Sequence, residues 1–174
     1  MIKAQSILIN LGLGILGSFL LGNVGPNSSL YSGKVLAQTA SCPLSDPSVV
    51  VTFLNSECKK VTLTTEQVFY RYYGNSVSKY GRYLTTDNFS TTSTAIRGLA
   101  LNQAWGNPAN KRVKVTLPAG TVIYQGSAAP QTPSDCYPGG AQQTFIEDSR
   151  DPKIKWEEAG EITIDPFCCP SQSR

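Results

Sequence analysis

Histidine is absent from all 174 residues of the chain. This absence excludes a Ser-His-Asp triad, a Cys-His pair and zinc sites with histidine ligands. The five cysteines lack the Cys-x-x-Cys spacing of a zinc ribbon, and there is no glycine-rich phosphate loop of the Walker type. These absences exclude several common classes of enzyme active site. The sequence predicts neither a metal site nor a resident cofactor.

The N-terminal region has almost no charge. Lys3 is the only charged residue before Lys34, and an apolar run that contains several glycines occupies residues 7–21. This run is shorter than the roughly 20 residues that a membrane-spanning helix needs, so a secretory signal peptide is favoured over an anchor. Val35-Leu36-Ala37 predicts cleavage after Ala37, with Ala40 as a second candidate. We expect the mature protein to be secreted, in an extracellular or periplasmic space.

Little net charge remains once the signal is removed. Two of the 15 basic residues, Lys3 and Lys34, fall within it, which leaves 13 basic against 12 acidic residues and a formal net charge of +1. Binding to nucleic acid or to a membrane surface through bulk charge is therefore not expected. The predicted organisation is a signal peptide over residues 1–37, an N-terminal segment over 38–66 and one domain over 67–174.

All five cysteines follow the predicted cleavage site. An exported protein is expected to oxidise them to disulfides. Cys42 and Cys58 flank one short segment and form a plausible pair, while Cys136 is expected to pair with Cys168 or Cys169. Because five is an odd number, at least one thiol is left over or pairs between chains.

Local sequence patterns predict many short strands and few helices. Residues 49–54 are rich in β-branched side chains and predict a strand, and residues 81–86 begin as another. Residues 65–70 either open a helix or run into a strand at 68–73. Residues 94–104 place apolar side chains on one side of a helix.

The second half of the chain adds three predicted strands. Residues 112–117 alternate polar and apolar side chains, and we expect this strand to pair with residues 121–126 across a turn at 118–120. Residues 142–146 form another short strand. The predicted fold class is α+β: a small, mostly antiparallel β-sheet domain with one or two short helices, stapled by disulfides.

Three segments combine aromatic residues, arginine and glycine, namely residues 69–74, 79–83 and 138–145. Tyrosine rings offer flat surfaces on which a base or a nicotinamide ring can stack. An arginine fork matches phosphate oxygens, and paired glycines let the backbone approach a ligand closely. Together these side chains point to a nucleotide-like ligand.

The order and the residue patterns of these segments resemble the tuberculosis necrotizing toxin domain, a family of secreted NAD glycohydrolases. The resemblance covers about two thirds of the mature chain. Two departures are visible: this chain lacks the histidine of bacterial members, and it lacks the prolines expected around Arg97. The matching stretches are Tyr70–Gly74, Tyr80–Thr85, Ile96–Leu101, Leu117–Thr121 continued at Gly126–Pro130, and Pro138–Thr144.

The resemblance implies hydrolysis of NAD(P)⁺ to nicotinamide and ADP-ribose(phosphate), with NAD⁺ as substrate rather than cofactor. It makes Gln143 and Arg71 the candidate catalytic residues, with Gln143 orienting the ribose or the attacking water. It makes Arg97, Tyr80 and Arg82 the candidate substrate-binding residues. In this scheme Arg71 and Arg97 bind phosphate, Tyr80 shapes the pocket, and Arg82 makes an additional, secondary contact with the ligand.

The expected reaction tolerates the missing histidine. Most glycosidases need a carboxylic acid to protonate the leaving group. Nicotinamide leaves a cationic pyridinium as a neutral molecule, so no general acid is required.

An ADP-ribosyltransferase is the first alternative function, but residues 142–147 lack its usual Glu-x-Glu or Gln-x-Glu pair. A non-catalytic binding domain is the second. Because NAD⁺ cleavage endangers the producing cell, we expect either export or a dedicated protein inhibitor.

Overall fold

A computed structural model describes residues 41–167 and 169 of the chain. The predicted signal peptide, both candidate cleavage sites and Cys168 lie outside the described residues. None of the described helices is long and apolar enough to cross a membrane. The helical elements are α1 (Pro47–Val50), the 3₁₀ turn η1 (Leu54–Ser56), α2 (Thr92–Gly98) and the 3₁₀ turn η2 (Gln103–Trp105). The strands are β1 (Lys59–Thr62), β2 (Gln67–Tyr73), β3 (Tyr83–Leu84), β4 (Lys111–Leu117), β5 (Val122–Ser127), β6 (Gln142–Phe145) and β7 (Lys155–Glu161).

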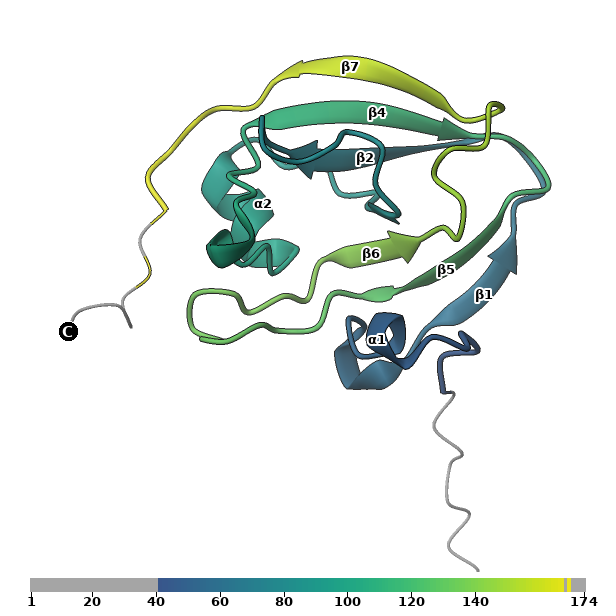
Figure 1. The fold of residues 1–174 in the computed structure, drawn as a ribbon, viewed down its shortest axis with the longest axis horizontal. Coiled ribbons are helices and arrows are strands. Elements are labelled where there is room, and N and C mark those ends of the chain that lie inside the picture. Colours follow the sequence, from purple (N-terminus) through teal and green to yellow (C-terminus); the bar gives the residue numbers. More distant parts are fainter. Residues whose placement is uncertain (1–40, 168, 170–174) are drawn as a thin grey trace, which may run out of the picture. The chain divides into compact units, whose positions relative to one another are not determined.

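The strands form two antiparallel sheets. One has the order β1-β5-β6-β3 and the other the order β2-β4-β7. Figure 1 shows them as two layers, with α2 at one end and α1 beneath the layer that contains β1. A single bridge between Tyr70 and Thr85 joins β2 to the residue that follows β3. The predicted class, a small α+β domain built mostly of antiparallel sheet with few short helices, is confirmed.

The main core lies between the two sheets because each sheet turns one apolar face inward. On β4 the buried residues Val113, Val115 and Leu117 alternate with more exposed neighbours. This is the period of a strand with one face in the core, and β-branched side chains suit it. The remaining members of this cluster come from both sheets and their connections: Leu63, Phe69, Tyr73, Leu84, Ile123, Ile146 and Ile154.

The expected pairing of residues 112–117 with 121–126 is wrong. β4 pairs with β2 and β7, whereas β5 pairs with β1 and β6. The turn between them carries the chain from one sheet to the other, and Gly120 adopts a φ of 87° there. Both strands are apolar on one face, and both faces contribute to the same core cluster, which includes Val115 and Ile123. Alternation gives the facing side of each strand but not its hydrogen-bonded neighbour.

The strand expected over residues 49–54 is also wrong. The chain instead forms α1 and η1, because Asp46 caps α1 by accepting the Ser48 N–H at 2.9 Å and Pro47 begins the helix. Val49 within α1 and Phe53 at the cap of η1 are both buried. They pack with Tyr124 and the two cysteines Cys42 and Cys58 in a separate cluster.

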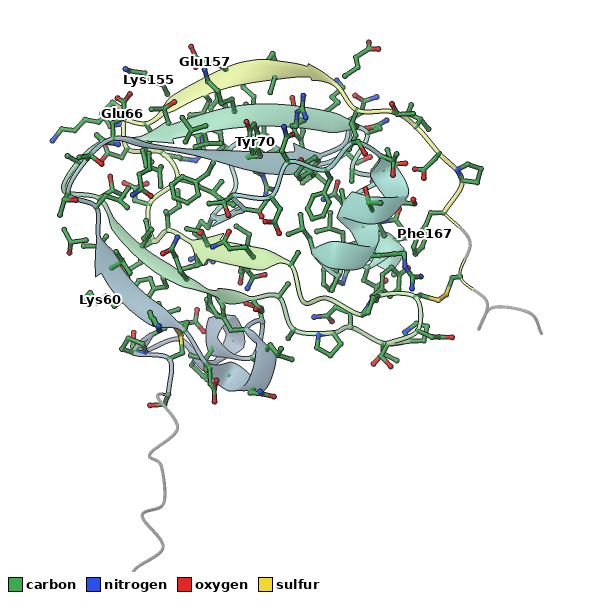
Figure 2. The ribbon with its side chains drawn as sticks, turned by 180° about the vertical axis from the view of Figure 1, so that it is seen from behind. Lys60, Glu66, Tyr70, Lys155, Glu157 and Phe167 are labelled. Carbon is green, nitrogen blue, oxygen red and sulfur yellow. A yellow bond between two sulfur atoms is a disulfide. The ribbon has the colours of Figure 1, made fainter. Side chains whose placement is uncertain are left out.

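Other predicted boundaries need smaller corrections. Residues 67–73 adopt the strand alternative and not the helix. The helix expected over 94–104 is α2, which begins at Thr92 and ends at Gly98, since Ala100 has a φ of 50°. β7 was not predicted. It is an edge strand rich in charge, and its Lys155 pairs with Glu66 on the outer face at 3.4 Å (Figure 2).

Two disulfides fasten the described residues. Cys42 pairs with Cys58, and Cys136 pairs with Cys169, which is one of the two partners expected for it. The first closes a segment with a sequence separation of 16. A disulfide that closes a loop of this size contributes about 3 kcal/mol to stability in the chain-entropy account.

The C-terminal segment ties down the start of α2. Asp165 accepts the Ser93 N–H and the Thr92 hydroxyl, both at 2.8 Å on Oδ1, while the Ser93 hydroxyl donates to Oδ2. The Ser93 hydroxyl and N–H hold the pKa of the half-buried Asp165 well below its usual range. A carboxylate here satisfies donors that the first turn of a helix leaves unpaired.

Replacing Asp165 with Asn should therefore lower the Tm by roughly 2–5 °C near pH 7. A depressed pKa means that the wild-type contribution is present above about pH 4 and is lost as the pH falls through the lower folded-state pKa. The Tm difference between wild type and Asp165→Asn should shrink toward pH 2, as measured by calorimetry across pH. Asp148→Asn, which touches the local Arg150 N–H, is the control. A difference that stays constant with pH would contradict this account.

Candidate active site

Residues from both sheets and from the turn after α2 line one cavity with a volume of about 350 Å³. β2 contributes Tyr70–Tyr72, the β3 region contributes Tyr83–Thr85, and the turn contributes Leu99–Leu101. Thr52, Trp105, Asn107 and Gln143 complete most of the wall. The volume lies at the lower end of the range of about 300–1,000 Å³ that is typical of small-molecule pockets.

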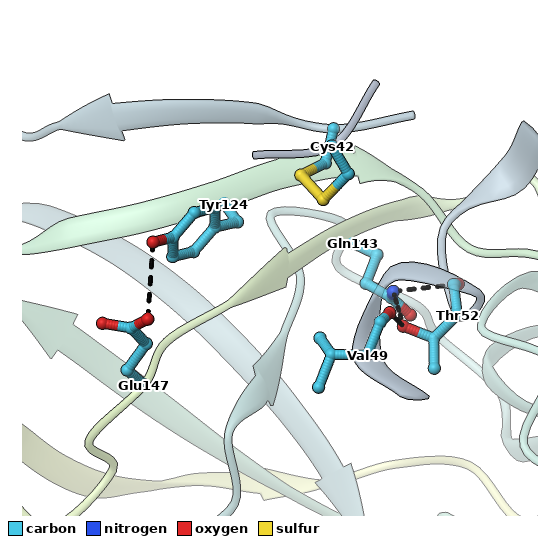
Figure 3. The surroundings of a disulfide bond; sticks show 7 residues. Cys42, Val49, Thr52, Tyr124, Gln143 and Glu147 are labelled. Atoms are coloured by element: carbon cyan, nitrogen blue, oxygen red, sulfur yellow. Dashed lines mark hydrogen bonds between the residues drawn. A yellow bond between two sulfur atoms is a disulfide. The ribbon is translucent and has the colours of Figure 1, made fainter. Parts of the chain in front are cut away.

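Gln143 is buried on β6 with its side chain in the cavity wall. Its Nε2 donates to the backbone oxygen and to the hydroxyl of Thr52, each at 3.0 Å (Figure 3). A buried amide needs such partners, because an unsatisfied polar group in the interior is costly. The side chain is therefore fixed by the segment between α1 and η1, far from it in sequence.

Arg71 reaches the same cavity from β2. It shares a strand face with Phe69 and Tyr73, so β2 carries a guanidinium on the side that faces the core. Its Nη1 donates to the Tyr83 carbonyl at 3.2 Å and its Nη2 to the Ser78 carbonyl at 3.4 Å. Nε is buried and has no partner among the described residues. The guanidinium thus retains donor capacity beyond these two contacts.

Burial lowers the pKa of Arg71 to about 10. This value remains well above neutrality, so the guanidinium is positively charged near pH 7. Among the described residues that line the cavity, Arg71 carries the only formal charge. The site therefore combines one cation with a neutral amide and several aromatic rings, which suits an anionic ligand with a flat ring.

The other three predicted site residues lie outside the cavity lining. Arg97 is exposed on α2. Tyr80 is 44% exposed and packs against Trp156 with ring centroids 5.5 Å apart. Arg82 is exposed, with its guanidinium 5.0 Å from the centroid of the Phe145 ring. The structure brings together Arg71 and Gln143 but places these three elsewhere on the surface.

The paired glycines of the 138–145 segment shape the backbone. Gly139 has a φ of 69°, and a side chain there would meet the Ala128 carbonyl at 2.5 Å. Its N–H donates to the Arg97 carbonyl, and the Gly140 N–H donates to Ala128. These bonds dock the end of α2 against the approach to β6. Close contact between two backbones explains Gly139 in this structure.

Sequence reasoning missed Trp105 and Thr52. Trp105 is 59% exposed yet lines the cavity, from a turn in which Gln103 Nε2 donates to the Leu101 and Asn107 carbonyls at 2.9 Å. Single exposed apolar side chains are common on protein surfaces, so it is the place of Trp105 in the cavity lining that makes it a candidate ligand contact. For Trp105 the sequence contained a signal, because a tryptophan stands next to Gly106. Nothing in the sequence pointed to Thr52.

Within residues 41–167 and 169, no three His, Cys, Asp or Glu side chains gather in a way that could hold a metal ion. The side chains of the cavity wall offer three kinds of contact. Arg71 can bind an anion, the amide of Gln143 can form hydrogen bonds, and the aromatic rings can stack on a ligand.

No protein-family model and no curated protein matches the chain. Among solved structures it is similar to Tne2, solved in complex with Tni2, with a TM-score of 0.54 and 14% identity over 65% of this chain and 99% of that chain. It is also similar to Tse6, solved in complex with Tsi6, with a TM-score of 0.44 and 19% identity over 64% of this chain and 82% of that one. The similarity to Tne2 shows a shared fold.

The position of the Arg71 guanidinium depends on Gly81. A Cβ at Gly81 would overlap the guanidinium, and the backbone of Gly81 is not in the left-handed region. We expect Gly81→Ala to fold, because only the end of a flexible side chain must move, but to displace Arg71 from the Tyr83 carbonyl. A crystal structure of the variant and its Tm check the two halves of this expectation. If the guanidinium of Arg71 has not moved in the variant, the expectation is wrong and Gly81 does not determine its position.

Proposed function

We propose that this protein is an exported NAD glycohydrolase that hydrolyses the bond between nicotinamide and ribose in NAD(P)⁺. The observation that carries the proposal is the shared cavity of Arg71 and Gln143. These two residues belong to separate segments of the chain, and they are the two that the resemblance to the tuberculosis necrotizing toxin domain makes catalytic. Their meeting in one pocket is what an NAD-cleaving site of that kind requires.

The reaction fits the side chains present. Water attacks C1′ of the nicotinamide ribose, and the bond from C1′ to the pyridinium nitrogen breaks. The electron pair leaves with nicotinamide, which becomes neutral, and the water proton passes to solvent. Arg71 binds a phosphate oxygen, since its guanidinium is cationic and has an unused donor. Gln143 orients the ribose or the water, and the aromatic wall excludes bulk solvent.

The size of the cavity suggests how the substrate lies. About 350 Å³ suits the nicotinamide riboside part of NAD⁺ with its first phosphate better than the whole dinucleotide. The rest of the molecule would then extend past the rim, where Trp105 is exposed. We therefore propose that Trp105 stacks on a base of the substrate.

The site of action and a protein partner belong to the same proposal. Two disulfides in the described residues suit an oxidising compartment outside the cytosol. An enzyme that destroys NAD⁺ needs containment, so we also propose a protein inhibitor as a partner. In support, the fold neighbour Tne2 was itself solved in complex with a second protein, Tni2.

The first experiment incubates the oxidised protein, from residue 38 onward, with NAD⁺ and separates the products. Free nicotinamide and ADP-ribose are expected. Replacing Gln143 with Ala should lower kcat by at least about 100-fold, the scale of losing one oriented polar group. Gln125→Ala, on the neighbouring strand and outside the cavity, is the control. Label transferred to protein would indicate a transferase instead, and intact NAD⁺ would indicate a binding domain.

The role of Trp105 is tested by KM. Stacking of a base on an aromatic side chain is worth about 1–3 kcal/mol, so Trp105→Ala should raise KM for NAD⁺ on the order of tenfold or more. Trp105→Phe should restore most of the affinity. Ile164→Ala, which removes another exposed apolar side chain (74% exposed) away from the cavity, should leave KM unchanged. Equal KM values for Trp105→Ala and wild type would remove Trp105 from the binding site.

A further inference from the structure

One residue holds the side-chain amide of Gln143. Gln143 Nε2 carries two hydrogens, and its two acceptors both belong to Thr52: the backbone oxygen and Oγ1, each at 3.0 Å (Figure 3). Both of these hydrogen bonds of Nε2 therefore go to one residue. In a planar amide Oε1 lies on the other branch from Nε2, so it is directed away from these two acceptors.

The bonds of Thr52 fix which way round this amide lies. The Thr52 hydroxyl donates its single hydrogen to the Val49 carbonyl at 2.7 Å, so Oγ1 faces Gln143 as an acceptor. The Thr52 carbonyl also accepts the Ala129 N–H at 2.8 Å. A flipped Gln143 would place Oε1 against two acceptors. The orientation with Nε2 toward Thr52 is thus the favourable one.

We propose that Thr52 is a positioning residue that directs the Oε1 atom of Gln143 into the cavity. Gln143 then acts as a hydrogen-bond acceptor, and its partner in the complex is an O–H group of the ribose or of the attacking water. A phosphate oxygen, which has no proton to donate, is excluded as that partner. This inference rests on the proposed function for the identity of the ligand, but the orientation of Gln143 follows from the hydrogen bonds alone.

The segment that carries Thr52 is pressed onto the strand pair that carries Gln143. Gly126 on β5 is the cross-strand partner of Gln143. A Cβ at Gly126 would lie 2.6 Å from the Glu57 carbonyl and 2.8 Å from the Phe53 ring. The backbone of Phe53 also bridges to Ala128. Glycine at position 126 lets the segment sit this close.

The Cys42–Cys58 disulfide closes this same segment on itself. Both cysteines are buried in the cluster that includes Val49 and Phe53, which lie three residues before and one residue after Thr52. The disulfide therefore limits how far the segment can move away from β5 and β6. It is part of what holds Thr52, and through Thr52 it holds Gln143.

Removing the Thr52 hydroxyl tests the proposal. Thr52→Val should lower kcat for NAD⁺ about tenfold, the scale of one hydrogen bond, with little change in KM. Thr52→Ser keeps the hydroxyl and should retain most of the activity. Thr121→Val is the matched control, because the Thr121 hydroxyl donates to the Pro118 carbonyl at 2.8 Å in the same i−3 arrangement but outside the cavity. A normal kcat in Thr52→Val, or an equal loss in Thr52→Ser, would overturn the proposal.

A second readout does not depend on activity. In NMR spectra of the wild type, the side-chain NH₂ of Gln143 should exchange slowly with water, and Thr52→Val should speed the exchange of one of its two protons. Fast exchange of both protons in the wild type would refute the orientation. If the wild type shows the protected NH₂ but does not cleave NAD⁺, the proposed function fails while the positioning of Gln143 stands.

The contribution of the disulfide has its own comparison. Replacing both Cys42 and Cys58 with Ser should reproduce the loss of kcat and the faster exchange of the Gln143 NH₂. Replacing Cys136 and Cys169 with Ser removes the other disulfide, on the α2 side, and should leave that NH₂ protected. A protected NH₂ and a normal kcat in the Cys42 and Cys58 variant would show that the disulfide does not hold Thr52.

Discussion

The guanidinium of Arg71 lies on the core-facing side of β2, and much of the surrounding structure accommodates it. A buried cation is unfavourable unless hydrogen bonds replace the water it loses. The carbonyls of Ser78 and Tyr83 supply two of them, which draws the loop before β3 over the side chain. Gly81 leaves the space that the guanidinium fills. The loop and the arginine therefore define one wall of the cavity together.

Another part of the cavity wall is built differently, from a neutral amide held by a segment near the start of the described residues. Gln143 contributes no charge, and its contacts with Thr52 leave one polar atom for a ligand. A cation on one wall and an oriented acceptor on the other suit a ligand that is anionic at one point and carries hydroxyl groups at another. A nucleotide ribose attached to a pyrophosphate, as in the proposed substrate, has this pattern.

Local patterns predicted the parts of the fold that local forces decide. β4 follows from alternation, and β6 lies within the short strand expected over residues 142–146. The Cys42–Cys58 pair was expected from the positions of these cysteines, whereas Cys136 had two expected partners, of which the structure shows Cys169. The pattern was misleading at residues 49–54, where the cap at Asp46 and the burial of Val49 and Phe53 outweigh β-branched propensity. The partner of β4 was not predictable, because an inward-facing strand can pair with a neighbour or pack across the core.

The candidate site also divides into residues that local motifs indicate and residues that only the tertiary structure brings together. Arg71 and Gln143 were singled out by the local motifs that carry the resemblance, and the structure brings them into one cavity. The places of Arg97 on α2 and of Tyr80 and Arg82 in the loop before β3 depend on tertiary packing that no motif encodes. Thr52 could not have been found, since its only link to Gln143 is tertiary and threonine is common in such segments. This asymmetry has a physical basis. A residue that touches substrate must have a particular chemistry, but a residue that orients it needs only one acceptor in the right place, and many sequences can supply that.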